Sequence, residues 1–537
     1  MNLLCNIRNL LSLAILTCCL QSLAQTPIKN WQLLDHEKDG VYGIGVEKAY
    51  STLLKNKKPK KKVLVAIIDV GMDITHPAFR GAIWTNQKEI AGNGRDDDGN
   101  GYVDDVHGWN FMGECKVETY DCIREYVKFK SKYERLTDTL TPGMRQWTKI
   151  KTETESFLKF RERIFNRTEP AIVALSILNA YWKNSLKADS VYIGKIIHSQ
   201  LPAGIDSNVI KAQKEVLTKV FPGDTLRRNA LTLQAVINGY QNVVDLYKGE
   251  YLTAKTIIEQ NDAGYFRKKS PGDDPYTNTD IHYGNSNTTT TMPHGNGVAG
   301  IIAASRTNPD MKGIADWVEL MPISIVSQKV IGEERDKDVA NAIRYAVDNG
   351  AAIINFSLGK KSSPQKILVD ESIRYAASKG VLLFAAAGND ASDNDLITDY
   401  PSAYFDDGSV ADNVFKVGAT TSGPSLVWKF SNYGKKNVDF FAPGDDIYST
   451  ALNSSYNRDS GTSYASPTAA GLAALIWSYY PNLTYKEVAK CITHSVEESN
   501  VLVTKPGSNE RVPFKALSRL GGMINAYKAL LFAATIH

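Results

Sequence analysis

This chain of 537 residues has little excess charge, few cysteines and no long apolar run beyond its first 24 residues. Its 62 Lys and Arg residues nearly balance 58 Asp and Glu residues, which leaves a net charge of +4. Such a balance favours neither nucleic acid nor an anionic membrane surface as a partner. We also expect no transmembrane helix, because no later apolar run is long enough to span a bilayer.

The N-terminus has the pattern of a secretory signal peptide. Arg8 is followed by the short apolar run "NLLSLAILTCCL", and small residues stand at Ser22 and Ala24. This arrangement predicts a signal peptide over residues 1–24 and a periplasmic, cell-surface or extracellular protein. A lipid anchor on Cys18 or Cys19 is the alternative, although the residues before them fit that motif poorly.

Only three cysteines lie beyond this leader: Cys115, Cys122 and Cys491. Cys115 and Cys122 are seven positions apart, so in an exported protein we expect them to form a local disulfide. Cys491 is then a buried thiol. Three cysteines without paired histidines do not form the usual ligand set of a zinc site, so we expect none.

Short β-branched runs alternate with helical patterns from about residue 63 to 107 and again from about 294 to 534. "KKVLVAIIDVG", "AAIINFSLG" and "GVLLFAAAGN" are typical of parallel strands that are buried on both faces. Helical stretches such as "KDVANAIRYAVDNG" separate them and end in glycine. The sequence therefore predicts an α/β domain with a central parallel sheet flanked by helices.

The middle of the chain, residues 113–276, has a different pattern. Val236, Tyr240, Val243 and Tyr247 share one helical face, and charged residues fill the other faces. We interpret this stretch as an inserted α-helical subdomain that divides the α/β domain into residues 25–112 and 277–537.

Four polar side chains occur where buried strands end or helices begin. Asp69 ends the strand "VLVAIID", and a carboxylate there needs a hydrogen-bonding partner. His294 opens the helical run "HGNGVAGIIAA", Ser463 precedes the helix of "SGTSYASP", and Asn389 follows the strand "LLFAAAGN". A serine at a helix N-terminus gains free N–H groups and the positive end of the helix dipole.

These segments, in the order Asp, His, Ser, resemble those of the subtilases, the subtilisin-like serine peptidases. "FSNYG", "FFAPGDDIYST" and "INFSLG" resemble further family stretches, so the likeness covers residues 31–113 and 280–537. The resemblance implies an exported serine endopeptidase that acts through an acyl-enzyme. Ser463 would be its nucleophile, His294 its base, and Asp69 the group that orients the base. Asn389 and the Ser463 N–H would stabilise the oxyanion.

The same resemblance predicts the peptide-binding walls. Ser357, Leu358 and Gly359 would pair with an extended substrate as an added strand, and Ala386, Ala387 and Gly388 would line the opposite wall. Asp399, before "YP", stands at the floor of the pocket for the side chain before the cut. Its carboxylate would favour Lys or Arg there, unless it is an ordinary loop aspartate that faces solvent.

Few residues separate the leader from the Asp69 strand, where many subtilases have a folding pro-domain, so we expect the chain either to fold without that helper or to use another element. Another departure favours a second hypothesis: Asn296 and Gly297 stand where the family usually has threonine and a second histidine. The alternative is therefore a catalytically weak or inactive subtilase-fold protein that binds partners through its helical segment. In an active enzyme, we expect this segment to shield the cleft or recruit a partner.

The stretch "GNGRDDDGNGYVDDVHGW" is typical of a calcium-binding loop. Asp96, Asp98 and Asn100 alternate as oxygen ligands, and Asp104 follows at the ninth position. The twelfth position is His107 and no helix pair flanks the loop, so this is no EF-hand domain. We expect a structural Ca²⁺ here, because packed carboxylates repel one another without a cation; a solvated acidic turn is the alternative.

Overall fold

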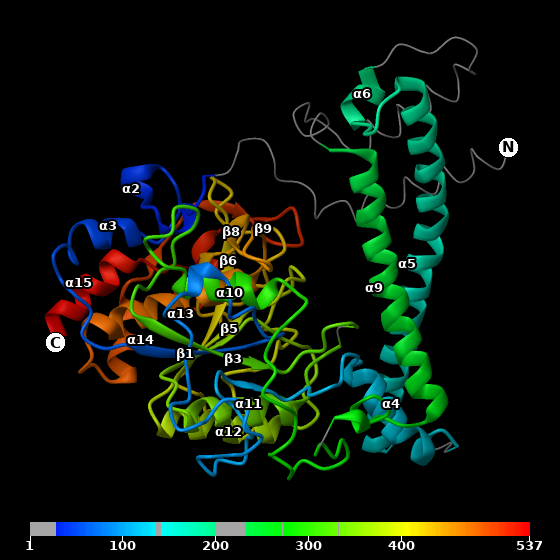
Figure 1. Ribbon diagram of the computed structural model, residues 1–537, viewed down its shortest axis with the longest axis horizontal. Helices are drawn as coiled ribbons and strands as arrows, with labels where there is room; N and C mark the ends of the chain where they lie inside the picture. Colours follow the sequence, from blue (N-terminus) through cyan, green and yellow to red (C-terminus); the bar gives the residue numbers. More distant parts are fainter. Residues whose placement is uncertain (1–27, 136–140, 199–230, 271, 331, 537) are drawn as a thin grey trace. The chain divides into compact units, whose positions relative to one another are not determined.

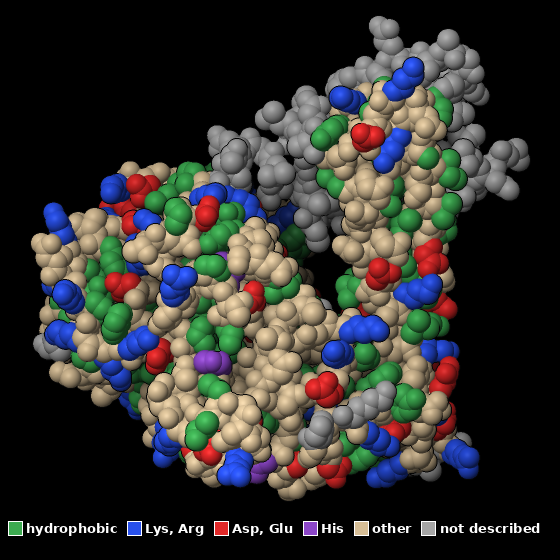
Figure 2. Space-filling model, in the orientation of Figure 1, with side chains coloured by type: hydrophobic (Ala, Val, Ile, Leu, Met, Phe, Trp, Pro, Cys, Tyr) green, Lys and Arg blue, Asp and Glu red, His purple; other side chains and the backbone are tan. Residues whose placement is uncertain are grey.

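The computed structural model describes residues 28–135, 141–198, 231–270, 272–330 and 332–536 (Figure 1). The predicted signal peptide, residues 1–24, lies outside this part of the chain. Within the described ranges, no helix is both long and apolar enough to cross a membrane. On the face shown in Figure 2, Lys and Arg side chains are interspersed with Asp and Glu, in keeping with the near-neutral sequence.

A nine-stranded sheet forms the centre of the larger unit, which comprises residues 28–121 and 264–537. Its strand order is β10-β13-β7-β6-β5-β4-β1-β3-β2, and every neighbouring pair is parallel except β10 and β13. The strands are β1 (Val63–Asp69), β2 (Trp109–Asn110), β3 (Val318–Ser324), β4 (Ile353–Phe356), β5 (Leu382–Ala386), β6 (Val414–Thr420), β7 (Phe440–Pro443), β10 (Glu497–Glu498) and β13 (Gly522–Met523).

Helices cover both faces of this sheet (Figure 1). Along β1, Val65 and Ile67 join the apolar cluster of one face, whereas Ala66 and Ile68 join that of the other. This alternation follows from the two-residue period of a strand. The predicted three-layer α/β fold is confirmed. The first face carries α3 (Val46–Ser51), α10 (His294–Ala303), α13 (Thr462–Tyr479), α14 (Tyr485–His494) and α15 (Ala526–Ile536), and the second carries α11 (Asp336–Asp348) and α12 (Lys366–Ser378).

Smaller elements complete this unit. Two short antiparallel pairs are β8 (Ile447–Thr450) with β9 (Tyr456–Asp459) and β11 (Leu502–Thr504) with β12 (Arg511–Pro513). The short helix α2 spans His36–Asp39, and 3-10 turns span Trp31–Leu33, Pro77–Phe79, Arg267–Lys269 and Phe514–Leu517.

Residues 122–263 form a second unit, which is helical in its described parts. It lies within the stretch that the sequence predicts as an insertion, residues 113–276. Its apolar cluster includes Trp182, Ile193 and Tyr240, so the unit has a core of its own. Its helices are α5 (Pro142–Leu186), α6 (Ile193–His198), α9 (Leu233–Gln260) and most of α4 (Asp121–Tyr133).

The predicted disulfide between Cys115 and Cys122 is wrong. Both residues are free cysteines, as is Cys491. The Cys115 thiol donates a hydrogen bond to the carbonyl of Val117 at 3.1 Å, and Cys122 lies in the first turn of α4. The close spacing therefore reflects a turn that leads into a helix, and a local hydrogen bond fixes the Cys115 side chain. Burial raises the pKa of the Cys115 thiol to about 11, so it stays protonated at neutral pH.

Candidate active site

Three neighbouring strands deliver polar residues to one edge of the sheet. Asp69 ends β1, Ser357 follows β4, and Asn389 lies three residues beyond β5. The order β5-β4-β1 is that of adjacent parallel strands, so their carboxyl ends meet at one edge. In open α/β sheets this edge is where ligands bind.

Asp69 and His294 form a close pair at this edge. The Nδ1 atom of His294 lies 2.8 Å from Oδ1 and 3.0 Å from Oδ2 of Asp69, whose side chain is fully buried. Oδ1 also accepts the backbone N–H of Val70 at 2.7 Å. The His294 side chain keeps 27% of its surface exposed, so its other ring nitrogen is within reach of a ligand.

The electrostatic surroundings of His294 favour its charged form. Burial lowers the pKa of the imidazole, but the charge and hydrogen bond of Asp69 and the charge of Asp459 outweigh that effect. The pKa of His294 therefore lies above its ordinary value of 6.5.

Ser463 is the second residue of α13, and the ring of its neighbour Tyr464 lies edge-on to His294. The Ser463 hydroxyl is not bonded to the imidazole. Oγ donates to the backbone carbonyl of Ser357 at 3.1 Å, and the Ser357 hydroxyl donates to the Ser463 carbonyl at 2.7 Å. The sequence predicts Ser463 at the start of this helix but does not predict its rotamer. Turning Oγ toward His294 requires one rotation about the Cα–Cβ bond, a change between staggered positions that exposed side chains make in picoseconds to nanoseconds.

Asn389 is oriented by a residue that sequence reasoning missed. Its Oδ1 accepts the backbone N–H of Thr462 at 2.9 Å and the Thr462 hydroxyl at 2.8 Å. Thr462 is fully buried, and its hydroxyl also accepts the N–H of Gly388 at 3.0 Å. With its oxygen fixed, Asn389 presents the two N–H groups of Nδ2 as donors. The N–H of Ser463, in the first turn of α13, is a further donor because it has no intrahelical acceptor.

A cleft of about 390 Å³ contains Ser463 and Asn389. Both predicted walls contribute to its lining, through Ser357, Leu358 and Gly359 on one side and Ala386 and Gly388 on the other. Ala387 is fully buried and is absent from this lining. Asp399 lies in the lining as predicted, and so does Tyr120, which sequence reasoning did not single out.

Lys360 anchors the end of the cleft wall formed by Ser357, Leu358 and Gly359. Its ammonium, which is 2% exposed, lies 2.7 Å from Asp121 and 2.8 Å from Asp336, and it donates to the carbonyl of Glu334 at 2.8 Å. A buried lysine with two carboxylates is fully satisfied, so the segment after β4 is held in one position.

The sequence profile of the Subtilase family matches residues 60–514. This chain belongs to the subtilase family. It is 34% identical to "Subtilisin" of Bacillus sp. (strain TA39) over 41% of this chain and 54% of that protein. It is 40% identical to "Thermophilic serine proteinase" of Bacillus sp. (strain AK1) over 34% of this chain and 42% of that protein. The chain thus spans about half the length of these relatives. A solved structure of the prenylagaramide maturation protease PagA shares 27% identity, with a TM-score of 0.38 over 45% of this chain and 82% of the other.

In this subtilase, a tyrosine fills the space beside Gly297. A Cβ atom on Gly297 would lie 2.9 Å from Cε1 and 3.1 Å from the hydroxyl of Tyr464. Tyr464 is 2% exposed, its hydroxyl donates to Asp459 at 2.8 Å, and its ring lies edge-on to His294 with the centroids 5.9 Å apart. Gly297 therefore leaves no gap next to the imidazole, because Tyr464 packs there.

This packing predicts an unusual response to alanine. In a helix interior, Gly→Ala ordinarily stabilises by about 1 kcal/mol. We expect Gly297→Ala instead to lower the melting temperature, by overpacking worth about 1–3 kcal/mol, because Tyr464 is anchored. Gly239→Ala is the matched control: it lies inside α9 and no atom lies within 4 Å of its added Cβ. Calorimetry that finds both variants stabilised would contradict this interpretation.

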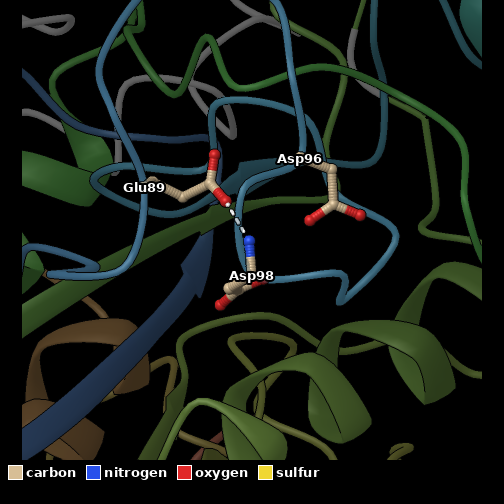
Figure 3. A group of neighbouring side chains, drawn as sticks. All are labelled: Glu89, Asp96 and Asp98. Carbon is tan, nitrogen blue, oxygen red and sulfur yellow. Dashed lines mark hydrogen bonds between the residues drawn. The ribbon is translucent and has the colours of Figure 1, made fainter.

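The predicted calcium loop brings some of its acidic residues together. One carboxylate oxygen each from Glu89, Asp96 and Asp98 lies within 4.8 Å of the other two (Figure 3). Sequence reasoning missed Glu89. Asp104 turns elsewhere and accepts the N–H groups of Asn93 and Gly94, at 3.2 and 2.9 Å.

Asn100, the fourth predicted ligand, is engaged within the loop. Its Oδ1 accepts the N–H of Tyr102 at 2.8 Å, and its Nδ2 donates to Asp105 at 3.2 Å. The amide therefore supports the turn of the loop, and the backbone N–H of Asn100 bonds to Asp96 and Asp98 of the three-carboxylate group, both at 3.1 Å.

Proposed function

We propose that this protein is an exported serine endopeptidase that cleaves peptide bonds through an acyl-enzyme. The observation that carries the proposal is the Asp69–His294 pair at 2.8 Å, whose imidazole lies edge-on to Tyr464; the neighbouring residue, Ser463, lines the cleft together with Asn389. The family membership supports the same reaction. Export rests on the leader pattern at residues 1–24 of the sequence.

Substrate binding itself prepares the nucleophile in this scheme. The Ser357 carbonyl that now accepts the Ser463 hydroxyl is also the acceptor that an extended peptide would use when it adds a strand to this wall. A substrate N–H that bonds to this carbonyl displaces the hydroxyl. The freed Oγ then turns to His294. Without substrate, the Ser463 hydroxyl stays hydrogen-bonded to the Ser357 carbonyl.

The chemical steps follow from the properties of the groups. His294 removes the hydroxyl proton as Oγ attacks the scissile carbonyl, and it later donates that proton to the leaving amine. Asp69 holds the imidazole in the tautomer with the proton on Nδ1 and stabilises the imidazolium. The Nδ2 group of Asn389 and the Ser463 N–H bind the developing oxyanion.

Labelling with a fluorophosphonate probe tests this proposal. The probe should react with the wild type and with Ser422→Ala, a control at an exposed serine, but not with Ser463→Ala. The far-ultraviolet circular dichroism of all three proteins should agree. Folded wild-type protein that takes up no label would instead favour the alternative, an inactive subtilase-fold protein that binds partners.

The pH dependence of activity should reflect the raised pKa of His294. Only the neutral imidazole accepts the serine proton, so kcat/KM is lost as the pH falls through this pKa, with a midpoint above 6.5. Asp459→Asn removes one charge that raises the pKa, so the midpoint should move to lower pH. The measurement is the pH profile of kcat/KM on a peptide p-nitroanilide. The exposed Asp407→Asn is the control, and an unmoved midpoint in Asp459→Asn would count against this account.

We further propose that the loop around Asp96 holds a structural Ca²⁺ through Glu89, Asp96 and Asp98. Three converging carboxylates suit this cation, and none of them pairs with a Lys or Arg in the described ranges. Burial raises the pKa of Asp96, but N–H groups of Gly101, Gly99 and Asn100 outweigh it, so the pKa is lowered and the group stays ionised. Bound Ca²⁺ would relieve the repulsion among the three charges.

Calcium should therefore stabilise the fold. At a Ca²⁺ concentration of about 100 times Kd, the linkage contributes about 2.7 kcal/mol, and a chelator removes it. We expect a melting temperature several degrees lower in chelator for the wild type, and little dependence on calcium for Asp98→Asn. Asp104→Asn should keep the calcium dependence, since Asp104 lies outside the cluster. A wild-type melting temperature that is the same with and without chelator would argue for a solvated acidic turn.

The helical unit is proposed as an accessory that shields the cleft or recruits a partner. Its separate apolar core, with Trp182 fully buried, supports a unit that keeps its own shape. The location of the protein after export is likewise a proposal, and so is any partner that the helical unit binds.

A further inference from the structure

The side chain that precedes the cleaved bond has a defined place in the cleft. In the proposed binding mode, with an acyl group on Ser463 and its oxygen directed to Asn389, this side chain would lie between Gly359 and Gly388, both of which line the cleft. What fills the space between these glycines decides which side chains fit.

The carboxylate of Asp399 occupies that space. A Cβ atom on Gly359 would collide with its Oδ1. A Cβ atom on Gly388 would collide with Nδ2 of Asn432 and would lie 2.9 Å from Oδ2 of Asp399. The two oxygens of one carboxylate thus contact both walls, and the Asp399 side chain is only 4% exposed. The Asp399 carboxylate therefore lies where a large substrate side chain would bind.

Two lysines hold the carboxylate in this position. Lys416, 5% exposed, donates to Oδ1 at 3.0 Å and to the carbonyl of Ala386 at 3.0 Å. Lys361 donates to Oδ2 at 2.9 Å and pairs with Asp390 at 3.0 Å, so it reaches from one wall of the cleft to the residue after Asn389. Burial lowers the pKa of Lys361, but Asp399 and Asp390 outweigh it and keep the ammonium charged.

The carboxylate of Asp399 is already paired. Asp399 and Asp390 are balanced by Lys361 and Lys416, while Glu333, Glu334 and Lys360 also line the cleft. A substrate Lys or Arg would have to displace Lys361 or Lys416 from Asp399, and displacing Lys416 would leave a buried ammonium without a carboxylate. The geometry therefore argues against Asp399 as a receptor for Lys or Arg.

The same ion pair separates the cleft from a second cavity. Asp399 and Lys416 both line a space of about 460 Å³, together with Val414 and Phe415 of β6, and Asp399 lines the catalytic cleft as well. The pair therefore lies between the cleft and a second pocket that is itself open to solvent.

We infer that the enzyme accepts small, uncharged residues such as Gly, Ala or Ser before the cut, and that Asp399, locked by Lys416 and Lys361, is the residue that sets this preference. The inference rests on the proposed peptidase function and names the substrate class of that site.

The first test compares peptide p-nitroanilides that differ only in the residue before the cleaved bond: Ala, Phe, Lys or Glu. We expect kcat/KM for Ala to exceed each of the others at least tenfold. A preference for Phe would show that the carboxylate does not limit the space, and a preference for Lys would restore Asp399 as a cation receptor; either result overturns the inference.

Two variants separate volume from charge. The double variant Asp399→Gly/Lys416→Ala removes the pair without leaving an unpaired buried charge, and it should raise kcat/KM for Phe relative to Ala at least tenfold. Asp399→Asn keeps the volume, so Ala should stay preferred; a gain for Phe in this variant would overturn the inference. The surface pair Arg374→Ala/Asp407→Gly is the matched control and should keep the wild-type order.

Titration with the fluorophosphonate probe gives the concentration of active sites in every sample. Labelled enzyme with another preference contradicts this inference alone. Folded wild-type protein without label contradicts the proposed function as well.

Discussion

Replacing Asp69 by asparagine is expected to lower kcat about 10⁴-fold while KM changes little. Both Asp69 oxygens lie within 3.0 Å of Nδ1 of His294, and Oδ1 is also fixed by the N–H of Val70. An asparagine amide at this place favours the tautomer with the proton on Nε2. That ring nitrogen then no longer accepts the serine proton, although the shape of the site is retained.

Steady-state kinetics on an alanine p-nitroanilide measure this effect. Asp73→Asn is the control on the same loop, because the Asp73 side chain bonds only to Thr75 in the described structure. Its kcat should stay near the wild-type value. A loss below tenfold in Asp69→Asn would mean that His294 does not depend on this carboxylate, and the proposed mechanism would fail.

The second large effect is expected at Asn389. Asn389→Ala should lower kcat by about 10²–10³ with KM nearly unchanged, because the lost donor acts only on the oxyanion of the transition state. The two bonds from Thr462 already fix Oδ1, so the amide is preorganised and binds charge without rearrangement. Removing it leaves the ground-state complex almost untouched.

A second substitution sharpens this test. Asn389→Asp has nearly the same size but offers a carboxylate instead of donors, so its kcat should fall at least as far as that of Asn389→Ala. The exposed Asn500→Ala is the control and should retain full activity. Equal losses in kcat and in substrate affinity at Asn389 would point to a structural role instead.

The sequence predicts the fold and the approximate positions of the site for a clear physical reason. Buried parallel strands read as apolar runs, and the polar residue that ends each run must lie at the sheet edge, as Asp69 does. Polar residues likewise mark the first turns of two helices, His294 in α10 and Ser463 in α13. These positions follow from local sequence patterns. The catalytic roles of the residues come from the family resemblance and remain proposals.

Contacts between distant segments are not encoded in such patterns. Lys416 reads as one polar residue in the apolar strand "NVFKVGA", and nothing local shows that its ammonium meets Asp399. Glu89 lies seven positions before Asp96, outside the alternating ligand pattern, and reaches the cluster through the fold of the loop. The fit of Tyr464 against Gly297 likewise depends on the packing of α13 on α10.

The wide separation of the catalytic groups along the chain has a consequence for biosynthesis. Asp69 and His294 are 225 positions apart, and Ser463 enters on α13, whose residues are almost all buried against the sheet. A growing polypeptide that still lacks α13 contains Asp69 and His294 but not Ser463. Under the proposed mechanism it therefore cannot cleave peptide bonds until α13 has been made and has docked on the sheet.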